Sequence, residues 1–600
     1  MKLHQYFLVA FLLLLFFTMV QCTDSQEESK VETVSNVPEW AQNVVWYQIF
    51  PERFRDGDPT NNPVAERINA PEGWEITPWG SDWYAQAEWE KNMDDIYRPV
   101  FYRRYGGDLQ GVMDKLDYLQ DLGVTAIWFN PIFDAVSLHK YDASAYHHID
   151  RHFGPDPEGD LEIMKQENPA DPSTWQWTSA DLLFLDLIQE AKERGIRIII
   201  DGVWNHTGRD FWAFRDIIAN GESSPYSDWY KIIEFSDEYE DGFDYEGWWG
   251  YKGLPEFTEV GEDLHPEVKA HIFAVTERWM APDGDIDRGV AGWRLDVAEE
   301  VGKDFWRDWL QHVRSINPEA FTVAEIWTDK AVDYVSEDMF NAVMNYRFTY
   351  ATHEFFIRKS IDAPTFGSRL TTLLEDFPKP VNLAMQNLMD GHDTERLATQ
   401  IVNADRTFKD NTIVRTEDND YDVRKPSKEE FDLLKLISLF QFSWKGSPMI
   451  YYGTEAGMWG ADDPDDRKPM IWPDIEFEDE VSHRFGRERP QDPVTFNTDL
   501  HQWYKKIADI RSSVEALGHG DLKLLSSDEN PDIFAFIRKI DAENYAILVF
   551  NRAESPQQLS IEHEYIAGNL TDLISNRILE STDEGLQIEI PAVSGMVLIP

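Results

Sequence analysis

The chain has 600 residues, of which 42% are hydrophobic and 14% are aromatic, so it contains enough apolar material for a large core. Acidic residues (110 Asp and Glu) outnumber basic residues (55 Lys and Arg), which gives a formal net charge of −55. This balance argues against a nucleic-acid partner and against an anionic membrane surface, because both attract basic patches.

The amino terminus, residues 1–22, is predicted to be an export signal. Lys2 supplies a positive charge, and residues 7–20 form an apolar stretch that is too short to span a membrane. Cys22 is the only cysteine, which excludes an intramolecular disulfide. Its position directly after the apolar stretch resembles a bacterial lipoprotein acceptor, and an ordinary cleaved signal with an incidental cysteine is the alternative.

The polar and acidic residues 23–38 are expected to form a flexible tether. With Cys22 as a lipid anchor, the protein is expected to be exported to an outer membrane, where it faces the periplasm or the cell surface. No other contact with a membrane is expected.

From residue 39 onward, apolar strand-like segments alternate with helical patterns. Two of the helical patterns, 111–123 and 182–195, end in glycine, a typical helix stop. Strands that alternate with helices imply parallel βαβ units, and eight of them suggest a closed (β/α)8 TIM barrel within residues 39–517. The predicted strands are 44–50, 126–132, 197–203, 290–297, 320–327, 342–346, 387–393 and 448–453.

Two segments do not fit the simple alternation. Residues 207–287, which follow the third predicted strand, are long for one loop and are rich in Trp, Tyr, Glu and Gly, so we expect an inserted subdomain that shapes substrate access. After a helical pattern at 497–517, residues 518–600 show short alternating runs separated by Asp, Asn, Glu and Gly. That pattern predicts a carboxyl-terminal antiparallel β-sandwich domain.

Polar clusters end four of the strand-like runs. They are DGVWNH (201–206), GWRLDVA (292–298), VAEIW (323–327) and MDGHD (389–393). Carboxylates at the carboxyl ends of barrel strands are typical of catalysis, because that face of the barrel carries the active site. One such carboxylate is more often solvated or salt-bridged, but Asp296, Glu325 and Asp393 occur together and in order.

With HKYDASAY (139–146), GWRLDVAEEV (292–301), AVMNYRF (342–348) and YYGTEAGMWGADDPDDRKPMIW (451–472), these segments resemble the α-amylase family of retaining glycoside hydrolases (glycoside hydrolase family 13). The resemblance covers residues 40–600 and is strongest to the neopullulanase and cyclomaltodextrinase group. It implies that Asp296 is the nucleophile, that Glu325 is the acid/base and that Asp393 grips the distorted sugar. A retaining mechanism needs one carboxylate and one carboxylic acid about 5 Å apart.

The resemblance also implies a set of substrate-binding residues. Arg294 lies two residues before Asp296 on one strand, so both side chains face the same way, and its charge is expected to keep Asp296 ionised. Asp201 is expected to organise the site by hydrogen bonds. Core or salt-bridge roles remain the alternative for the others. The implied binding residues are Tyr141, His206, Arg294, Glu300, Trp327, His392, Asp463 and Arg467.

A second cluster is rich in oxygen ligands and lies in RDGDPTNNP (55–63) and YGGDLQG (105–111). Asp, Asn and carbonyl oxygens suit Ca²⁺, and an Asp/Asn-rich turn capped by its own side chains is the alternative. A structural calcium is expected, since the retaining mechanism uses no metal. By resemblance to neopullulanase-type enzymes, the ligands are Asp56, Asp58, Asn61, Asn62, the Gly106 carbonyl and Asp108.

Some positions depart from the family pattern. In LPEFT (254–258), Glu256 replaces a cation and Thr258 replaces Asn, while Glu299 stands where Asn is usual and Gly391 where Ser is frequent. These changes are predicted to affect specificity more than the core chemistry. The group commonly carries an amino-terminal β-sandwich module that supports dimers. The barrel here is expected to start near residue 40 without it, so the sequence supports neither that route to dimers nor the narrow cyclodextrin pocket that it creates.

The leading functional hypothesis is a retaining α-glucan hydrolase that cleaves α-1,4 bonds in starch, maltooligosaccharides, pullulan or cyclodextrins, with some α-1,6 cleavage left open. Its partner would be an α-glucan oligo- or polysaccharide. The first alternative is an α-glucanotransferase with the same active site. The second is a non-catalytic glucan-binding lipoprotein, which should have lost a catalytic carboxylate, whereas all three are present.

Overall fold

The computed structural model describes residues 36–93, 97–408, 421–525, 530–562, 566, 568–582 and 585–600. The predicted export signal with Cys22, and the predicted tether up to residue 35, lie outside the described residues. Within the described part, no helix is long and apolar enough to cross a membrane.

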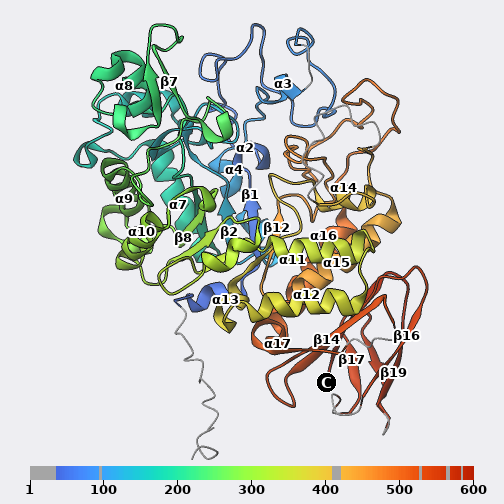
Figure 1. Cartoon of the computed structure of the whole chain (residues 1–600). Helices are drawn as coiled ribbons and strands as arrows, with labels where there is room; N and C mark the ends of the chain where they lie inside the picture. Colours follow the sequence, from blue (N-terminus) through green and yellow to red (C-terminus); the bar gives the residue numbers. More distant parts are fainter. Residues whose placement is uncertain are drawn as a thin grey trace, which may run out of the picture.

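A sheet of eight parallel strands forms the centre of the described part of the chain (Figure 1). The strands follow one another around the sheet in chain order, and β12 pairs with β1. The last seam is closed by a parallel bridge between Met344 and Gln386 and by a 2.8 Å bond from the Asn345 N–H to the Gln386 carbonyl. The predicted (β/α)8 barrel is therefore confirmed. Its strands are β1 (Trp46–Ile49), β2 (Ala126–Phe129), β5 (Arg197–Gly202), β8 (Gly292–Leu295), β9 (Phe321–Ala324), β10 (Ala342–Val343), β11 (Gln386–Asn387) and β12 (Ser447–Tyr451).

Every residue of β1, β2, β8, β9 and β12 is buried, because one face of each strand meets the barrel interior and the other meets the helices. This explains why these segments read as continuous apolar runs. The seventh strand is shorter than the predicted 387–393, since the ladder ends at Asn387. Beyond it the chain turns, and Asp390 accepts hydrogen bonds from the Leu397 N–H (3.0 Å) and the Thr454 hydroxyl (2.7 Å). Asp393 therefore stands in the loop above the strand.

Helices cover the outside of the barrel. Gly123 (φ 89°) and Gly195 (φ 75°) end two of them at the predicted stop positions, because glycine adopts such positive φ angles without steric cost. The helices that follow the strands are α4 (Leu109–Met113), α5 (Leu116–Leu122), α7 (Ser179–Glu193), α9 (Pro266–Met280), α10 (Lys303–Ile316), α11 (Tyr346–Thr352), α12 (Ala363–Glu375), α13 (Lys379–Ala384), α14 (Leu397–Val402), α15 (Lys428–Ser443), α16 (Thr498–Ser513) and α17 (Glu515–His519).

The loops at the carboxyl ends of the strands carry further structure. Segment 207–287 forms a small lobe with α8 (Trp212–Asn220), β6 (Ile232–Phe235) and β7 (Phe243–Tyr245), and it then continues into α9, which packs against α10. The lobe proper thus ends before α9, because that helix is the crossover between β5 and β8. Shorter elements complete this end of the barrel: α2 (Pro51–Phe54), α3 (Tyr97–Val100), the hairpin β3 (Phe133–Ala135) and β4 (Ala143–Ile149), and α6 (Pro157–Met164).

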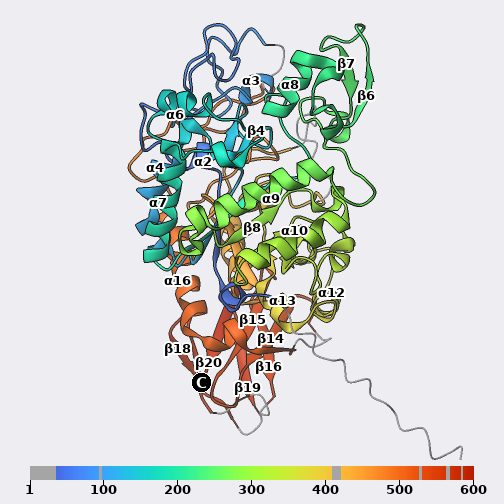
Figure 2. The same ribbon diagram turned by 90° about the vertical axis from the view of Figure 1, so that its left-hand side faces the viewer.

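The carboxyl-terminal part is an antiparallel sandwich at the opposite end of the molecule from the inserted lobe (Figure 2). Ile533, Ala535 and Ile537 of β14 face the smaller sheet, whereas Phe534 and Phe536 pack with the barrel helices. The larger sheet is therefore buried on both faces. It contains β13 (Asp521–Leu524), β14 (Ile533–Lys539), β15 (Tyr545–Asn551), β20 (Ser594–Ile599), β17 (Leu570–Asp572) and β18 (Arg577–Leu579), and the smaller one pairs β16 (Gln557–Ile561) with β19 (Leu586–Ile590).

Candidate active site

The carboxyl ends of β5, β8 and β9 bring three carboxylates around one fully buried arginine. Arg294 Nη1 donates to Asp296 Oδ1 at 3.0 Å and to both oxygens of Asp201 at 2.9 Å. Its Nη2 forms an ion pair with Glu325 Oε1 at 2.8 Å. The guanidinium also lies 5.0 Å from the centroid of the Trp128 ring. A planar, always charged fork of this kind fixes the mutual position of the carboxylates that it binds.

The backbone just after Asp296 helps to hold Glu325. Val297 adopts φ 37° and ψ 49°, a left-handed conformation that is strained for a β-branched residue. In this conformation its N–H donates to Glu325 Oε2 at 3.0 Å, and the Trp327 indole N–H donates to Oε1 at 3.1 Å. Glu325 is therefore fixed by two N–H donors and one guanidinium.

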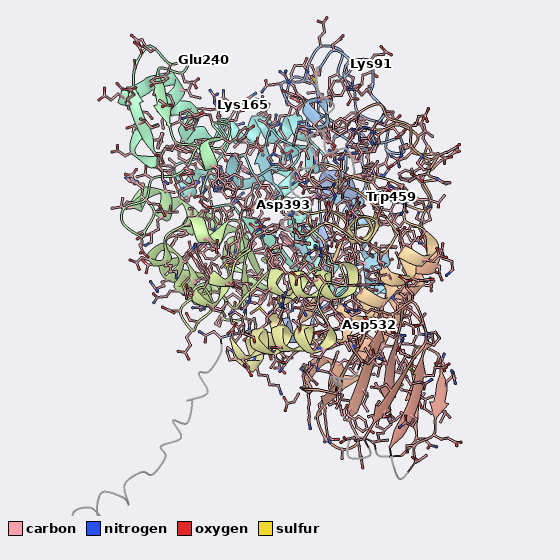
Figure 3. The ribbon with its side chains drawn as sticks, turned by 45° about the vertical axis from the view of Figure 1, so that its right-hand side comes forward. Lys91, Lys165, Glu240, Asp393, Trp459 and Asp532 are labelled. Atoms are coloured by element: carbon pink, nitrogen blue, oxygen red, sulfur yellow. The ribbon has the colours of Figure 1, made fainter. Side chains whose placement is uncertain are left out.

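The fourth carboxylate of the pocket comes from the loop after β11. Asp393 Oδ1 accepts a 2.9 Å bond from Arg467 Nη2, and Oδ2 lies 3.0 Å from His392 Nε2. Arg467 Nη1 also pairs with Asp463 Oδ1 at 2.9 Å. Figure 3 shows Asp393 between the inserted lobe and the loops on the other side of the barrel mouth. Solvent reaches 36% of its side chain, so this carboxylate faces an open space.

Tyr141 connects the two halves of the pocket. Its hydroxyl donates to Asp201 Oδ2 at 3.1 Å and lies 2.6 Å from His392 Nε2. The two rings are nearly parallel, with centroids 5.5 Å apart and planes 9° apart. On the far side of the imidazole, the amide of Gln48 lies 3.0 Å from His392 Nδ1. These contacts join the Arg294 group to Asp393.

Burial dominates the protonation of this pocket. It raises the pKa of Asp296 well above its usual range, although Arg294 opposes the shift, and it raises the pKa of Asp201 to about 6. It also raises the pKa of Asp393 to about 7, a shift that solvent at the exposed third of this side chain will reduce. Burial thus opposes the ionisation of Asp296 that the charge of Arg294 favours. The carboxylates titrate as a group, and burial favours retention of a proton among them.

The remaining predicted binding residues lie around this centre. The His206 ring stacks on Trp248, with centroids 5.5 Å apart, and its buried Nε2 has no hydrogen-bond partner among the described residues. Burial lowers the pKa of His206 to about 3, so the imidazole is neutral. Glu300 lies further out, where its Oε1 accepts a 3.1 Å bond from the indole of Trp249, a side chain that is 82% exposed.

Comparison with known proteins agrees with this geometry. The family model for the α-amylase catalytic domain matches residues 48–167 and 179–520. The chain belongs to the α-amylase family. It is a glycoside hydrolase with the barrel and the polar strand ends described above.

Relatives of this α-amylase-family protein match it over most of its length. A cyclomaltodextrinase of Geobacillus thermopakistaniensis is 33% identical over 554 residues, which cover 92% of this chain and 76% of the relative. Neopullulanase 2 of Thermoactinomyces vulgaris is 33% identical over 565 residues, covering 94% and 79%. Among solved structures, the cyclic α-maltosyl-(1→6)-maltose hydrolase of Arthrobacter globiformis in complex with that sugar is 26% identical, with a TM-score of 0.67, covering 94% of this chain and all of the other.

Several residues of this α-amylase-family pocket were missed by the sequence reasoning. Gln48 and Trp128 lie inside β1 and β2 and support His392 and Arg294, and Tyr346 stacks on Trp327 with ring centroids 3.9 Å apart. Trp248 stacks on His206. Only Gln48 carried a usable signal, because a fully buried amide in an apolar strand requires polar partners. The aromatic rings looked like ordinary core residues.

The negative charge of Glu256 in the altered loop 254–258 is balanced by a lysine elsewhere in the inserted lobe. Glu256, which stands where the family has a cation, forms a 2.7 Å salt bridge with Lys231 from the inserted lobe. Glu256 also pairs with His206 through an isolated antiparallel bridge, and the Thr258 N–H donates to the Trp229 carbonyl at 2.8 Å. The loop therefore fastens the inserted lobe next to the pocket.

Four of the predicted calcium ligands lie in the turn 55–63, whereas Gly106 and Asp108 come from segment 105–111, and their oxygens differ in availability. Buried oxygens of Asp56, Asn61 and Asn62 have no hydrogen-bond partner among the described residues. Gly106 lies against Asn62, since a β-carbon on it would come within 1.9 Å of Asn62 Oδ1. Unpaired buried oxygens in one turn fit a hard cation such as Ca²⁺.

Two other predicted ligands, Asp108 and Asp58, accept hydrogen bonds from neighbouring groups. Asp108 accepts four of them, from the N–H groups of Gly57, Asp58 and Gly111 and from the Asn61 amide, at 2.6 to 3.1 Å. It is the N-cap of α4. Asp58 Oδ1 accepts from both the N–H and the hydroxyl of Thr60. These two carboxylates shape the turn, as the capped-turn alternative requires.

Proposed function

We propose that the protein is a retaining α-glucan hydrolase that cleaves α-1,4 bonds through a covalent glycosyl-enzyme. One observation carries this proposal: a single guanidinium, that of Arg294, binds Asp296 and Glu325 on its two terminal nitrogens. Such a fork keeps the two carboxyl groups close, as the retaining mechanism requires. An inverting enzyme needs a wider separation that leaves room for a water molecule.

In the proposed reaction, Glu325 donates a proton to the leaving oxygen while Asp296 attacks the anomeric carbon. The deprotonated Glu325 then takes a proton from water, which attacks the same carbon and releases Asp296. Asp393 would bind sugar hydroxyls, because it faces the open space and its oxygens are aligned by Arg467 and His392. The raised pKa of Asp296 supports a proton held within the group at neutral pH.

The proposed sugar contacts come from polar and aromatic groups around the pocket. The unpartnered Nε2 of His206 would meet a sugar hydroxyl at the reacting ring, where Tyr141 offers an aromatic face. Asp463 and Arg467 would contact the sugar on the non-reducing side. The stacked Trp327 and Glu300 would line the acceptor side.

The substrate class follows from the relatives. Their names refer to cyclomaltodextrin and to a cyclic maltosyl-(1→6)-maltose. We propose starch-derived maltooligosaccharides, pullulan and cyclodextrins as substrates, with α-1,6 cleavage as a secondary activity. The initial anomer formed from maltotetraose, observed by proton NMR, tests the mechanism. An α-anomer is expected, and a β-anomer would contradict the proposal.

An α-glucanotransferase with the same residues is the second candidate. The observation that favours it is the Trp327–Tyr346 stack, with ring centroids 3.9 Å apart, which presents a flat acceptor platform beside Glu325. Chromatography of products from maltooligosaccharides, pullulan and cyclodextrins separates the two. Shorter products support hydrolysis. Products longer than the substrate, without net release of reducing ends, would show that the protein is a transferase and not a hydrolase.

We also propose a structural Ca²⁺ in the turn of Asp56, Asn61 and Asn62, with the Gly106 carbonyl completing the set. Removal of calcium with a chelator should lower the melting temperature by several degrees, and added Ca²⁺ should restore it. Asn62→Ala should abolish this response. Asp58→Asn serves as the matched control, because Asp58 caps Thr60, and it should keep the response. A wild type whose melting temperature does not change with the chelator would contradict the proposal.

For localisation, we propose export and lipid anchoring at Cys22. Support comes from the apolar stretch before the cysteine and the acidic segment after it. Cys22→Ala should move the protein from the membrane fraction to the soluble fraction. A wild type that is soluble from the start would favour the ordinary cleaved signal instead.

A further inference from the structure

Two adjacent histidines form a second buried polar cluster, outside the catalytic pocket. His147 and His148 lie in β4, and Glu167 follows α6. Each side chain is at most 2% exposed. One ligand atom from each of the three lies within 4.8 Å of those of the other two. Figure 3 labels Lys165, two residues before Glu167, well apart from Asp393.

Neighbouring groups orient the three ligand atoms toward one point. Nδ1 of His148 lies 2.8 Å from Asp181 Oδ2, which leaves Nε2 directed at Glu167. The other oxygen of Glu167 accepts a hydrogen bond from the Gln176 N–H. Asp181 is in turn held by Arg278 at 3.0 Å. A carboxylate that fixes the far nitrogen of an imidazole is the usual support for a metal-bound histidine.

The described protein groups give the imidazole of His147 no good hydrogen bond. Its Nε2 is 3.5 Å from Glu167 Oε2, beyond the usual range for an N–H···O bond, and its Nδ1 has no partner among the described residues. The Trp175 ring covers one face of the imidazole, with centroids 4.5 Å apart. A buried polar ring without good hydrogen bonds lowers stability. Coordination through Nε2 would give it a strong partner.

We propose that His147, His148 and Glu167 bind a transition-metal dication, with Zn²⁺ as the best fit. Two imidazole nitrogens and one carboxylate oxygen are a typical zinc set, whereas Ca²⁺ requires oxygen ligands. On binding, Nε2 of His148 releases its proton to solvent and donates its lone pair to the metal, so no oxidant or reductant is needed. The opposing model is a protein-only network, in which doubly protonated His148 bridges Glu167 and Asp181.

The site would brace the hairpin strand that supports the catalytic pocket. Tyr146, directly before His147, donates from its hydroxyl to the carbonyls of Val203 and His206 at 2.7 and 2.8 Å. A metal that fixes β4 would therefore fix the segment that carries His206. The expected role is structural, since the cluster contacts neither Asp296 nor Glu325 in the described part of the chain.

The test uses the full chain without an affinity tag, stripped with EDTA and then supplied with Ca²⁺, so that the oxygen-rich turn is filled. Zn²⁺ is added, excess metal is removed by gel filtration, and bound zinc is measured by inductively coupled plasma mass spectrometry. About one zinc per chain and a higher melting temperature are expected for the wild type.

Two variants locate the site. His147→Gln should lose the zinc and its thermal effect, while the metal-free melting temperature changes little because His147 lacks a good hydrogen bond. His271→Gln is the matched control. Its imidazole is also buried, with its ring centroid 6.3 Å from that of His147, but it is not a ligand, so zinc should be retained. Absence of zinc from the wild type, or zinc retained by His147→Gln, would overturn the proposal in favour of the protein-only network.

Discussion

Two fully buried arginines, in two regions of this protein, have opposite partners. In the pocket, Arg294 binds the carboxylates of Asp201, Asp296 and Glu325. Between the barrel and the carboxyl-terminal sandwich, the partners of Arg538 among the described residues are backbone carbonyls, including those of Ser443 and Gly520 at 3.2 Å. The first cation organises negative charge. The second satisfies the ends of helices where the two domains meet.

The pKa shifts reflect the same contrast. Burial works against the charge of Arg294, but the surrounding carboxylates outweigh it and raise its pKa well above the usual value. For Arg538, burial lowers the pKa to about 9, because carbonyl dipoles offer less compensation than full negative charges. Burial alone therefore does not identify a functional charge. A group of carboxylates around one buried cation indicates a functional site, because such carboxylates titrate at shifted pKa values.

The largest loss of activity is expected for Asp296→Asn. It keeps the shape of the side chain and removes the nucleophile, so kcat should fall by at least about 10⁴-fold. The melting temperature should stay within a few degrees. Glu325→Gln is the matched variant: it should still form the intermediate from α-maltosyl fluoride, whose leaving group needs no proton, whereas Asp296→Asn should not. Equal activity of both variants on the fluoride would contradict the assigned roles.

Arg294→Met tests the organising cation. It leaves three buried carboxylates without their guanidinium, and we expect a loss of about 3–5 kcal/mol in the free energy of unfolding. The value of kcat/KM should fall by about 10²-fold or more as Glu325 loses its orientation. Urea denaturation and steady-state kinetics measure both effects. Arg294→Lys, which keeps the charge but not the fork, should recover stability more than activity. Full recovery of activity would show that the fork is dispensable.

Glu395 lies two residues after Asp393, and its substitution tests how a buried carboxyl group affects stability. Burial raises its pKa from 4.5 to about 8, so the folded protein keeps a proton that the unfolded chain releases above about pH 4.5. This contribution to stability is complete below pH 4.5 and is lost as the pH rises through 8. Glu395→Gln cannot titrate. Relative to the wild type, its free energy of unfolding should therefore increase by about 2–4 kcal/mol between pH 5 and 8, as measured with urea. Parallel pH profiles would contradict the shift.

The smallest effect is expected at the domain interface. Arg538→Met removes a buried charge but also leaves carbonyls without donors, so the free energy of unfolding should fall by about 1–3 kcal/mol. Because this arginine is remote from the carboxylate group, kcat should stay within about twofold of the wild type. Urea denaturation and kinetics on maltotetraose provide both values. A large loss of activity at constant stability would mean that the interface controls the pocket.

The order of the barrel strands and the three central carboxylates were predictable from local pattern. Runs such as 126–129 are buried on both sides, so their composition is apolar throughout, and polar residues begin where each strand leaves the core. The seventh strand was overestimated, because Leu388 and Met389 stay apolar and buried although the ladder ends at Asn387. Apolar composition reports burial, and it does not distinguish a strand from a buried turn.

By itself, the sequence determined which catalytic groups are available: the ends of the barrel strands carry Asp296, Glu325 and Asp393 in that order. Only the tertiary structure decided how the charges share their partners, because these contacts join segments far apart in the chain. It brought Trp128 to Arg294 and Lys231 to Glu256. It also assigned the four hydrogen-bonding positions of Asp108 to the turn and left Asp56, Asn61 and Asn62 with free oxygens. Patterns along a chain reveal which groups are present, whereas burial and distance decide which of them remain free to react.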